Sequence, residues 1–274
     1  MIVDSQVHVW VEDPGDEPWP PTRGRPPVAP SKVHRHLDAA GVIDEMDRAG
    51  VDRAVIVPSA STGRGNAPAL AAVAADPERF GIMGLVDLDA PTSIDVARWR
   101  SRPGMLGFRL VFHRPDSPTD ANAQWLYAQA EEHGVPIMLF APHQLDQVRR
   151  VARAYPRLKL VLDHMNVATS LRDEQAYAEM EATLALADES NLAVKVSALA
   201  CYVTEPYPFE RLTAQIARIV DAFGPHRSLF GSDLTRLPCT YAEWIATVRR
   251  GIASFSEDEQ ALVMGGALEA WLGW

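Results

Sequence analysis

The alternation of short apolar segments with helical segments is the feature that most restricts how this chain can fold. Eight segments are typical of strands buried on both faces, because they are short, apolar and mostly bounded by glycine, proline or aspartate. These predicted strands lie at residues 2–10, 52–58, 80–86, 106–112, 136–140, 158–164, 192–197 and 228–233. Predicted helices follow them at residues 42–49, 68–75, 93–101, 121–133, 143–154, 173–189, 209–223 and 241–254, and a last helix is predicted at 257–271.

Strict alternation of strands and helices predicts a parallel sheet. Eight repeats in a chain of 274 residues favour a closed (β/α)8 barrel over an open doubly wound sheet. The open sheet would carry a glycine-rich phosphate turn after its first strand, and neither G-x-G-x-x-G nor G-x-x-x-x-G-K occurs. We therefore expect the α/β class and a single TIM-barrel domain over residues 1–274.

Residues 11–31 interrupt the alternation with a proline-rich segment. Proline removes backbone donors, so this segment is neither a helix nor a central strand. Long loops in compact domains are usually functional lids or disordered. Trp10 before the segment and Trp19 within it favour an ordered lid, and a surface segment without a role is the alternative.

Charge and composition restrict the partners of the protein. The formal net charge is −10, and no basic run exceeds a pair such as Arg149-Arg150, which argues against a nucleic-acid partner. Two cysteines, Cys201 and Cys239, are too few for a disulfide framework. No apolar run is long enough to span a bilayer, and Met1 leads straight into a strand without a secretion signal. We expect a cytoplasmic protein that acts on a small molecule, without a membrane partner.

Polar residues at the ends of the predicted strands are the candidates for chemistry, because TIM barrels place their active sites there. Those that bear on the site are Gln6, His8, Arg109, His113, Asp163, His164, Ser197 and Asp233. Barrel closure would bring the eighth strand beside the first, so that His8, His164 and Asp233 converge. Two imidazoles and a carboxylate suit a zinc-like metal with open positions. They also suit a metal-free site, in which the carboxylate activates water and the imidazoles polarise a carbonyl.

Four short motifs carry a resemblance to a known family. They are D-x-x-V-H-x-W at residues 4–10, L-D-H-M at 162–165, K-V-S-A at 195–198 and F-G-S-D at 230–233. Their order and spacing resemble the amidohydrolase-2 branch of the amidohydrolase superfamily, over nearly the whole chain. Within that branch they are most similar to the lactonase-like group that contains 2-pyrone-4,6-dicarboxylate lactonase and the sugar-lactone hydrolases. The resemblance implies a TIM barrel that hydrolyses lactones or related compounds, and sister groups decarboxylate.

The resemblance also implies roles for the converging residues. His8 matches the second histidine of the family's H-x-H, His164 matches a later histidine, and Asp233 matches the aspartate that deprotonates the attacking water. Gln6 departs from the pattern, because it stands where the first histidine is expected and is a poor ligand for a borderline-soft metal. The pyrone-dicarboxylate lactonase is described as metal-independent. We therefore expect no required cofactor, and one Zn²⁺ or another divalent metal on His8, His164 and Asp233 is the alternative.

Further residues are expected to bind the substrate. The planar fork of Arg109 suits a substrate carboxylate, and a buried arginine tied to a barrel carboxylate is the alternative. The amide of Gln6 would help to hold the reacting carbonyl oxygen. The rest of the predicted rim consists of His113, Ser197, Trp19 and Tyr202, whose aromatic members favour a cyclic or aromatic substrate or have a packing role alone. Lys195 is expected to pair with a neighbouring barrel acid.

The sequence thus predicts a hydrolase that acts on a lactone or a similar activated carbonyl of a small, carboxylated or aromatic-derived metabolite, with water activated by Asp233. One alternative is a zinc-dependent decarboxylase of an aromatic or unsaturated acid, and another is a ligand-binding barrel without catalysis. Near the C-terminus, Trp271 and Trp274 are expected either to cover a subunit contact in a homo-oligomer or to plug the bottom of the barrel.

Overall fold

The computed structural model describes residues 1–10, 37–59, 65–114 and 117–274. The whole proline-rich segment at residues 11–31, with Trp19, lies outside the described residues. Its role as a lid stays a prediction.

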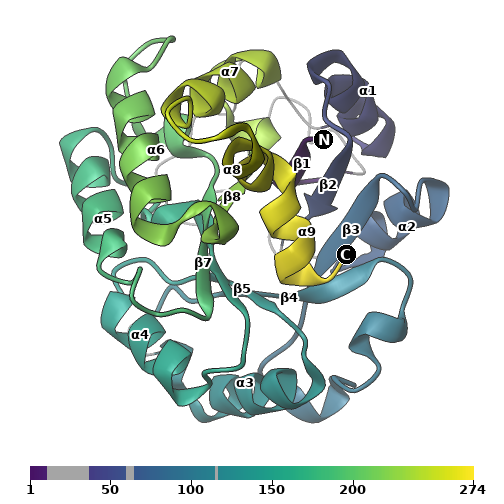
Figure 1. Ribbon diagram of the computed structural model, residues 1–274. Helices are drawn as coiled ribbons and strands as arrows, with labels where there is room; N and C mark the ends of the chain where they lie inside the picture. Colours follow the sequence, from purple (N-terminus) through teal and green to yellow (C-terminus); the bar gives the residue numbers. More distant parts are fainter. Residues whose placement is uncertain (11–36, 60–64, 115–116) are drawn as a thin grey trace.

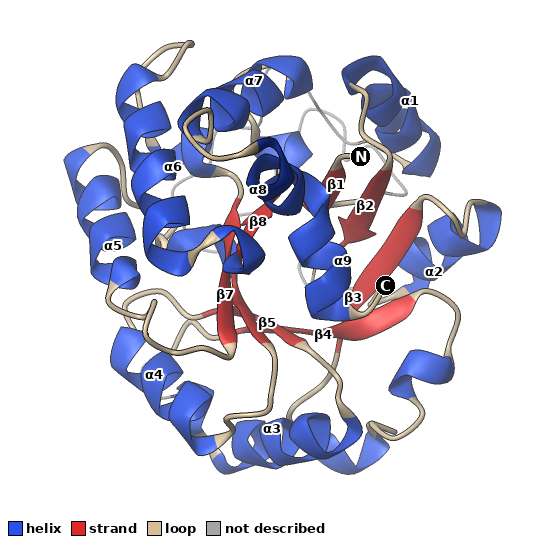
Figure 2. Ribbon diagram, in the orientation of Figure 1, coloured by secondary structure: helices blue, strands red, loops and turns tan. Residues whose placement is uncertain are grey.

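Eight parallel strands form one sheet in chain order, and helices surround them (Figures 1 and 2). The strands are β1 (Val3–Val7), β2 (Arg53–Ile56), β3 (Phe80–Leu85), β4 (Met105–Val111), β5 (Ile137–Phe140), β6 (Leu160–Leu162), β7 (Leu192–Val196) and β8 (Ser228–Phe230). All eight predicted strands are present, with shorter ends. The predicted (β/α)8 barrel is confirmed.

Most of the predicted helices are also present. They are α1 (Ala39–Ala49), α2 (Ala67–Ala75), α3 (Ala121–His133), α4 (Leu145–Ala154), α5 (Glu174–Leu184), α6 (Glu210–Phe223) and α7 (Tyr241–Gly251). The helix predicted at residues 93–101 was wrong, because β3 and β4 are connected by two short 3-10 turns, Pro91–Ser93 and Trp99–Ser101. Trp99 is buried there and donates its indole N–H to the carbonyl of Gly107, so one large side chain replaces an amphipathic helical face.

The helix predicted at residues 257–271 is divided into α8 (Glu257–Ala261), a π-helical turn (Leu262–Gly266) and α9 (Ala267–Leu272). Gly265 causes the break, because its backbone leaves the helical region and packs directly on Val3 of β1. A side chain at this position would collide with Val3. The break lets α9 lie across the ring of strands (Figure 1).

The lower half of the barrel lumen is filled by apolar side chains. They are Val3, Val55, Val57, Met83, Leu106, Met138, Val161, Ala193 and Leu229, and Ala267, Leu268 and Leu272 of α9 close them off. Trp274 and Trp271 pack against this interior cluster, beneath the cations of Arg53 and Lys159 respectively. The C-terminal tryptophans therefore belong to the plug of the barrel.

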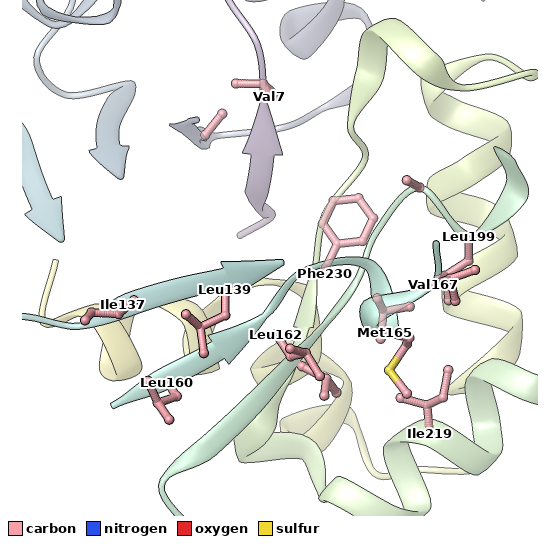
Figure 3. Packing of buried hydrophobic residues seen from close by; sticks show 14 of the residues in the cluster. Val7, Ile137, Leu139, Leu160, Leu162, Met165, Val167, Leu199, Ile219 and Phe230 are labelled. Atoms are coloured by element: carbon pink, nitrogen blue, oxygen red, sulfur yellow. The ribbon is translucent and has the colours of Figure 1, made fainter. Parts of the chain in front are cut away.

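A second and larger core lies between the strands and the helices. Figure 3 shows residues of β5 and β6 that belong to this core, such as Leu139 and Leu162. Near them lie Met165, from the turn after β6, and Ile219, from α6. This outer core holds the strands at a fixed position under their loops. It leaves the upper lumen for polar groups.

An irregularity in β1 decides which of its residues face the lumen. Residues three and seven would share one face of a regular strand, yet Val3 belongs to the interior cluster and Val7 to the outer core. The register with β2 shifts between Asp4 and Val7, as at a β-bulge. This shift turns Gln6 into the barrel, where its side chain meets β7.

The seam between β8 and β1 is joined through the side chain of Asp4. One carboxylate oxygen accepts the N–H groups of Gln6 and Ser232, at 2.7 and 2.9 Å, and the other accepts the hydroxyl of Tyr241. Burial raises the pKa of Asp4, and the hydrogen bonds from Ser232 and Tyr241 partly oppose this. The N–H of Asp233 donates to the carbonyl of Gln6 at 2.8 Å. These bonds fix the rim of β8 against the rim of β1.

Candidate active site

Unusual backbone conformations follow three adjacent strands at the carboxyl end of the barrel. His164 after β6, Ala198 after β7 and Asp233 after β8 all have left-handed backbone angles, with φ of 52°, 56° and 55°. Residues other than glycine adopt these backbone angles at an energetic cost, and such backbone strain concentrates at functional sites. The backbone therefore marks the same rim at which the sequence places its candidate residues.

The strained turn after β6 is held in place by side-chain bonds. Asn166 exchanges two hydrogen bonds with the backbone of Ala141, at 2.9 and 2.8 Å. Thr183 of α5 donates to the carbonyl of Met165 at 2.8 Å. His164 is thus positioned by its neighbours on both sides.

Three of the predicted site residues meet at the rim. The Nε2 atom of His8 lies 3.2 Å from one oxygen of Asp233, and Nε2 of His164 lies 3.6 Å from the other. Arg236 donates from Nη1 to the second oxygen at 2.9 Å. Together with Ser197, these residues form the rim cluster.

Asp233 is ionised in this setting. Burial alone would raise the pKa of its carboxyl group, but the charge of Arg236 and the contact with His8 lower it well below the usual range. The result is a buried, ionised carboxylate between two imidazoles, which can accept a hydrogen bond from a water molecule.

The two imidazoles differ in their burial and in the partners of their Nδ1 atoms. Nδ1 of His8 lies 2.6 Å from the carbonyl of Val57, which can only accept, so this nitrogen carries a proton. The other nitrogen of this ring, Nε2, lies 3.2 Å from an oxygen of Asp233. His164 is neutral at pH 7, because burial lowers its pKa to about 4 against the opposing charges of Asp233 and Asp163.

Ser197 orients the neutral imidazole. Its hydroxyl lies 2.7 Å from Nδ1 of His164, and both side chains are buried. The shared hydrogen bond holds the ring with Nε2 toward Asp233. Ser197 therefore contacts His164 and acts on the site by orienting that ring.

A second polar group lies in the upper lumen, with no side chain more than slightly exposed. The Nζ atom of Lys195 lies 2.8 Å from a carboxylate oxygen of Asp163 and 2.6 Å from the side-chain amide oxygen, Oε1, of Gln6. Arg109 donates from Nε to the other oxygen of Asp163 at 3.1 Å. Gln6, Arg109, Asp163 and Lys195 form the inner cluster. The expected pairing of Lys195 with a barrel acid is confirmed.

The inner cluster holds two cations, Lys195 and Arg109, and one carboxylate, Asp163. Burial would raise the pKa of Asp163, but Lys195, Arg109 and His164 lower it. Burial lowers the pKa of Lys195, and the charge of Asp163 opposes that shift. The carboxylate therefore neutralises a cation that no water reaches.

The structure places the other predicted residues differently. His113 is exposed and its ring lies edge-on to Phe140. Tyr202 is fully buried, with the guanidinium of Arg236 over its ring. Arg109 is tied to Asp163 through Nε, the alternative foreseen from the sequence, and this is the only hydrogen bond of its side chain within the described residues. Trp19 lies outside them.

Both cysteines are poor nucleophiles. Burial raises the pKa of Cys201 to about 12 and that of Cys239 to about 12. Both are free thiols. Their surroundings fit a structural role.

Arg236 is the functional residue that sequence reasoning missed. It follows Asp233 by three residues in a 3-10 turn, Leu234–Arg236, that directly succeeds β8. The spacing is the available signal, because residues three apart in such a turn lie one above the other. An arginine three residues after an aspartate at the end of a strand can therefore be predicted to pair with that aspartate.

Comparisons with known proteins agree with the fold and show the family. The family model described as Amidohydrolase matches residues 3–273. An L-fucono-1,5-lactonase from Burkholderia multivorans is 30% identical, over 97% of this chain and 94% of its own length. An L-fucono-1,5-lactonase from Burkholderia ambifaria is 27% identical, over 96% and 92%.

Solved structures show the same fold. A crystal structure of an amidohydrolase from Burkholderia multivorans with bound zinc superposes with a TM-score of 0.82, at 22% identity, over 100% of this chain and 99% of that one. No helix within the described parts of the chain is long and apolar enough to cross a membrane.

Proposed function

The chain belongs to the amidohydrolase family, and on this premise we propose that it hydrolyses the cyclic ester of a small sugar-derived acid. The observation that carries the proposal is the buried, ionised Asp233 between His8 and His164 at the rim of β8. The lactonases among its relatives support the substrate class.

The reaction adds water across the ester bond. Asp233 takes a proton from the water molecule as its oxygen attacks the carbonyl carbon. Negative charge then builds on the carbonyl oxygen, where the N–H of the Gln6 side-chain amide stabilises it. The bond from the carbonyl carbon to the ring oxygen breaks, and the proton held by Asp233 passes to that oxygen. The product is an open-chain hydroxy acid.

His164 has a supporting role in this scheme. It is neutral, so it adds no positive charge beside Asp233. Its Nε2 faces the second oxygen of Asp233, where it orients the carboxylate and the water together.

A divalent metal does not fit the donor set that surrounds Asp233. Zinc prefers imidazole, thiolate and carboxylate ligands in a tetrahedron. Within the described residues, no three His, Cys, Asp or Glu side chains are arranged to hold an ion. The side-chain amide oxygen of Gln6 already accepts a hydrogen bond from Lys195, and one oxygen of Asp233 accepts a hydrogen bond from Arg236. We therefore propose that hydrolysis proceeds without a metal, although one related structure contains zinc.

The substrate class is tested with purified protein and a panel of five- and six-membered sugar lactones, by following acid release at constant pH. The panel also includes aromatic carboxylic acids, because a decarboxylase is the alternative derived from the sequence. We expect lactone hydrolysis that survives exhaustive chelation. Turnover of the aromatic acids alone, or of nothing in the panel, contradicts the proposed function.

A further inference from the structure

Lys195 lies directly beneath the rim and takes no part in the proposed reaction. It precedes Ser197 by two residues on β7, so both side chains face the lumen, with Ser197 at the rim and Lys195 one layer deeper. Its side chain is fully buried, forms an ion pair with Asp163 and donates a hydrogen bond to Gln6. A buried cation is retained only where its partners compensate for the loss of water.

The contact with Lys195 fixes the orientation of the Gln6 amide. An ammonium group can only donate, so the atom of Gln6 at 2.6 Å is the carbonyl oxygen and the amide nitrogen points elsewhere. This nitrogen is buried and has no hydrogen-bond partner among the described residues. An unsatisfied buried donor is costly, and an oxygen of a bound substrate would satisfy it.

We propose that Lys195 is a positioning residue. Its ammonium group holds the side-chain amide oxygen of Gln6 inward, so that the amide nitrogen of Gln6 faces the substrate oxygen. The same contact occupies the acceptor that a metal would otherwise use. The first part rests on the proposed function. The second part concerns the protein alone.

The geometry favours this role over a purely structural one. Asp163 already has Arg109 as a partner, so it does not need Lys195 to avoid standing alone. Gln6 faces the same side of β1 as His8, which contacts Asp233. Fixing the amide therefore fixes a donor next to the reacting groups, and such preorganised donors are what stabilise an oxyanion.

A double-mutant cycle tests the action of Lys195 through Gln6. Gln6→Leu removes the amide, and Lys195→Met removes the ammonium while Asp163 keeps Arg109. We expect each single variant to lower kcat by about 100-fold with little change in KM. We expect the double variant to be no slower than Gln6→Leu, because both changes remove one function. Losses that multiply overturn the proposal.

Gln6→Glu provides a second test that keeps Lys195 fully paired. The new carboxylate still accepts from the ammonium but has no N–H for the oxyanion. Folding, measured by circular dichroism and Tm, is expected to be retained, and kcat is expected to fall by at least about 100-fold. Wild-type kcat in this variant overturns the proposal, even if Lys195→Met does not fold.

Zinc binding tests the second part without any substrate. Each protein is dialysed against zinc chloride, and then bound zinc is counted by mass spectrometry and Tm is compared with and without the ion. Gln6→His alone is expected to stay below one zinc per chain, because Lys195 still occupies this position. Gln6→His with Lys195→Met is expected to bind one zinc and to gain in Tm. Equal and stoichiometric zinc in both variants overturns this part, whatever the substrate proves to be.

Discussion

Two buried aspartates in one barrel, Asp233 in the rim cluster and Asp163 in the inner cluster, show how the surroundings give the same side chain different roles. Each contacts an arginine and a second basic group, and the pKa of each is lowered by those partners against the effect of burial. They differ in their access to solvent. The side chains of Asp163 and Lys195 are both 0% exposed, whereas His8 and Arg236 beside Asp233 are 14% and 19% exposed.

This difference separates catalysis from support. The partners of Asp233 include the imidazole of His8 and the guanidinium of Arg236, which are partly exposed at the rim. The partners of Asp163 are the ammonium of Lys195, which is fully buried, and the guanidinium of Arg109, which is 11% exposed. The same electrostatic balance therefore serves a reaction at the rim and preorganisation below it.

The largest expected effect comes from removing the charge at the rim. Asp233→Asn keeps the shape of the side chain but cannot accept a proton from water, so kcat is expected to fall by up to about 10,000-fold. Tm should change little, because His8 and Arg236 lie near enough to solvent to be hydrated. Lactone hydrolysis at the wild-type rate would show that another group activates the water.

The matching change below the rim is expected to act on folding. Asp163→Asn leaves Lys195 and Arg109 as buried cations without a carboxylate, and should lower the free energy of unfolding by about 3–5 kcal/mol. Denaturant titration measures the loss. If this variant is as stable as the wild type while Asp233→Asn unfolds, the assignment of the two aspartates is reversed.

His164 links the two clusters and makes stability depend on pH. Its pKa falls from the ordinary value of 6.5 to about 4 on folding, so the unfolded chain binds the proton more readily. Stability is therefore complete above pH 6.5 and lost as the pH falls toward 4, by up to about 3 kcal/mol from this group. His164→Asn should flatten the Tm profile in that range. An unchanged profile would assign the acid sensitivity to other groups.

The smallest expected effect concerns the seam that carries the rim. Tyr241→Phe removes a hydroxyl that donates to buried Asp4 and should destabilise the protein by about 1–3 kcal/mol. Tyr127→Phe is the matched control, because its buried hydroxyl has no partner within the described residues. The control should be neutral or stabilising. Equal losses in both would mean that packing, rather than the bond to Asp4, holds the seam.

Much of the fold follows from local patterns in the sequence. Buried parallel strands must be short and apolar, so all eight were predictable, whereas the segment at 93–101 was not, because the burial of Trp99 overrides local preference. His8, His164 and Asp233 were predictable as neighbours once the barrel was assumed. The burial of Tyr202 and the pairing of Arg236 with Asp233 were not, because they depend on how loops settle on the rim.

The sequence by itself determined the barrel, the end of it that carries polar residues, and the departure from the family's histidine at Gln6. Only the tertiary structure decided what Gln6 does. Its partner Lys195 is 189 residues away, and they meet because the irregularity in β1 turns Gln6 inward beside β7. Periodicity records which face of a strand is apolar, but it does not record which polar side chains meet across a closed lumen. That pairing depends on register and on the volume left by every other strand.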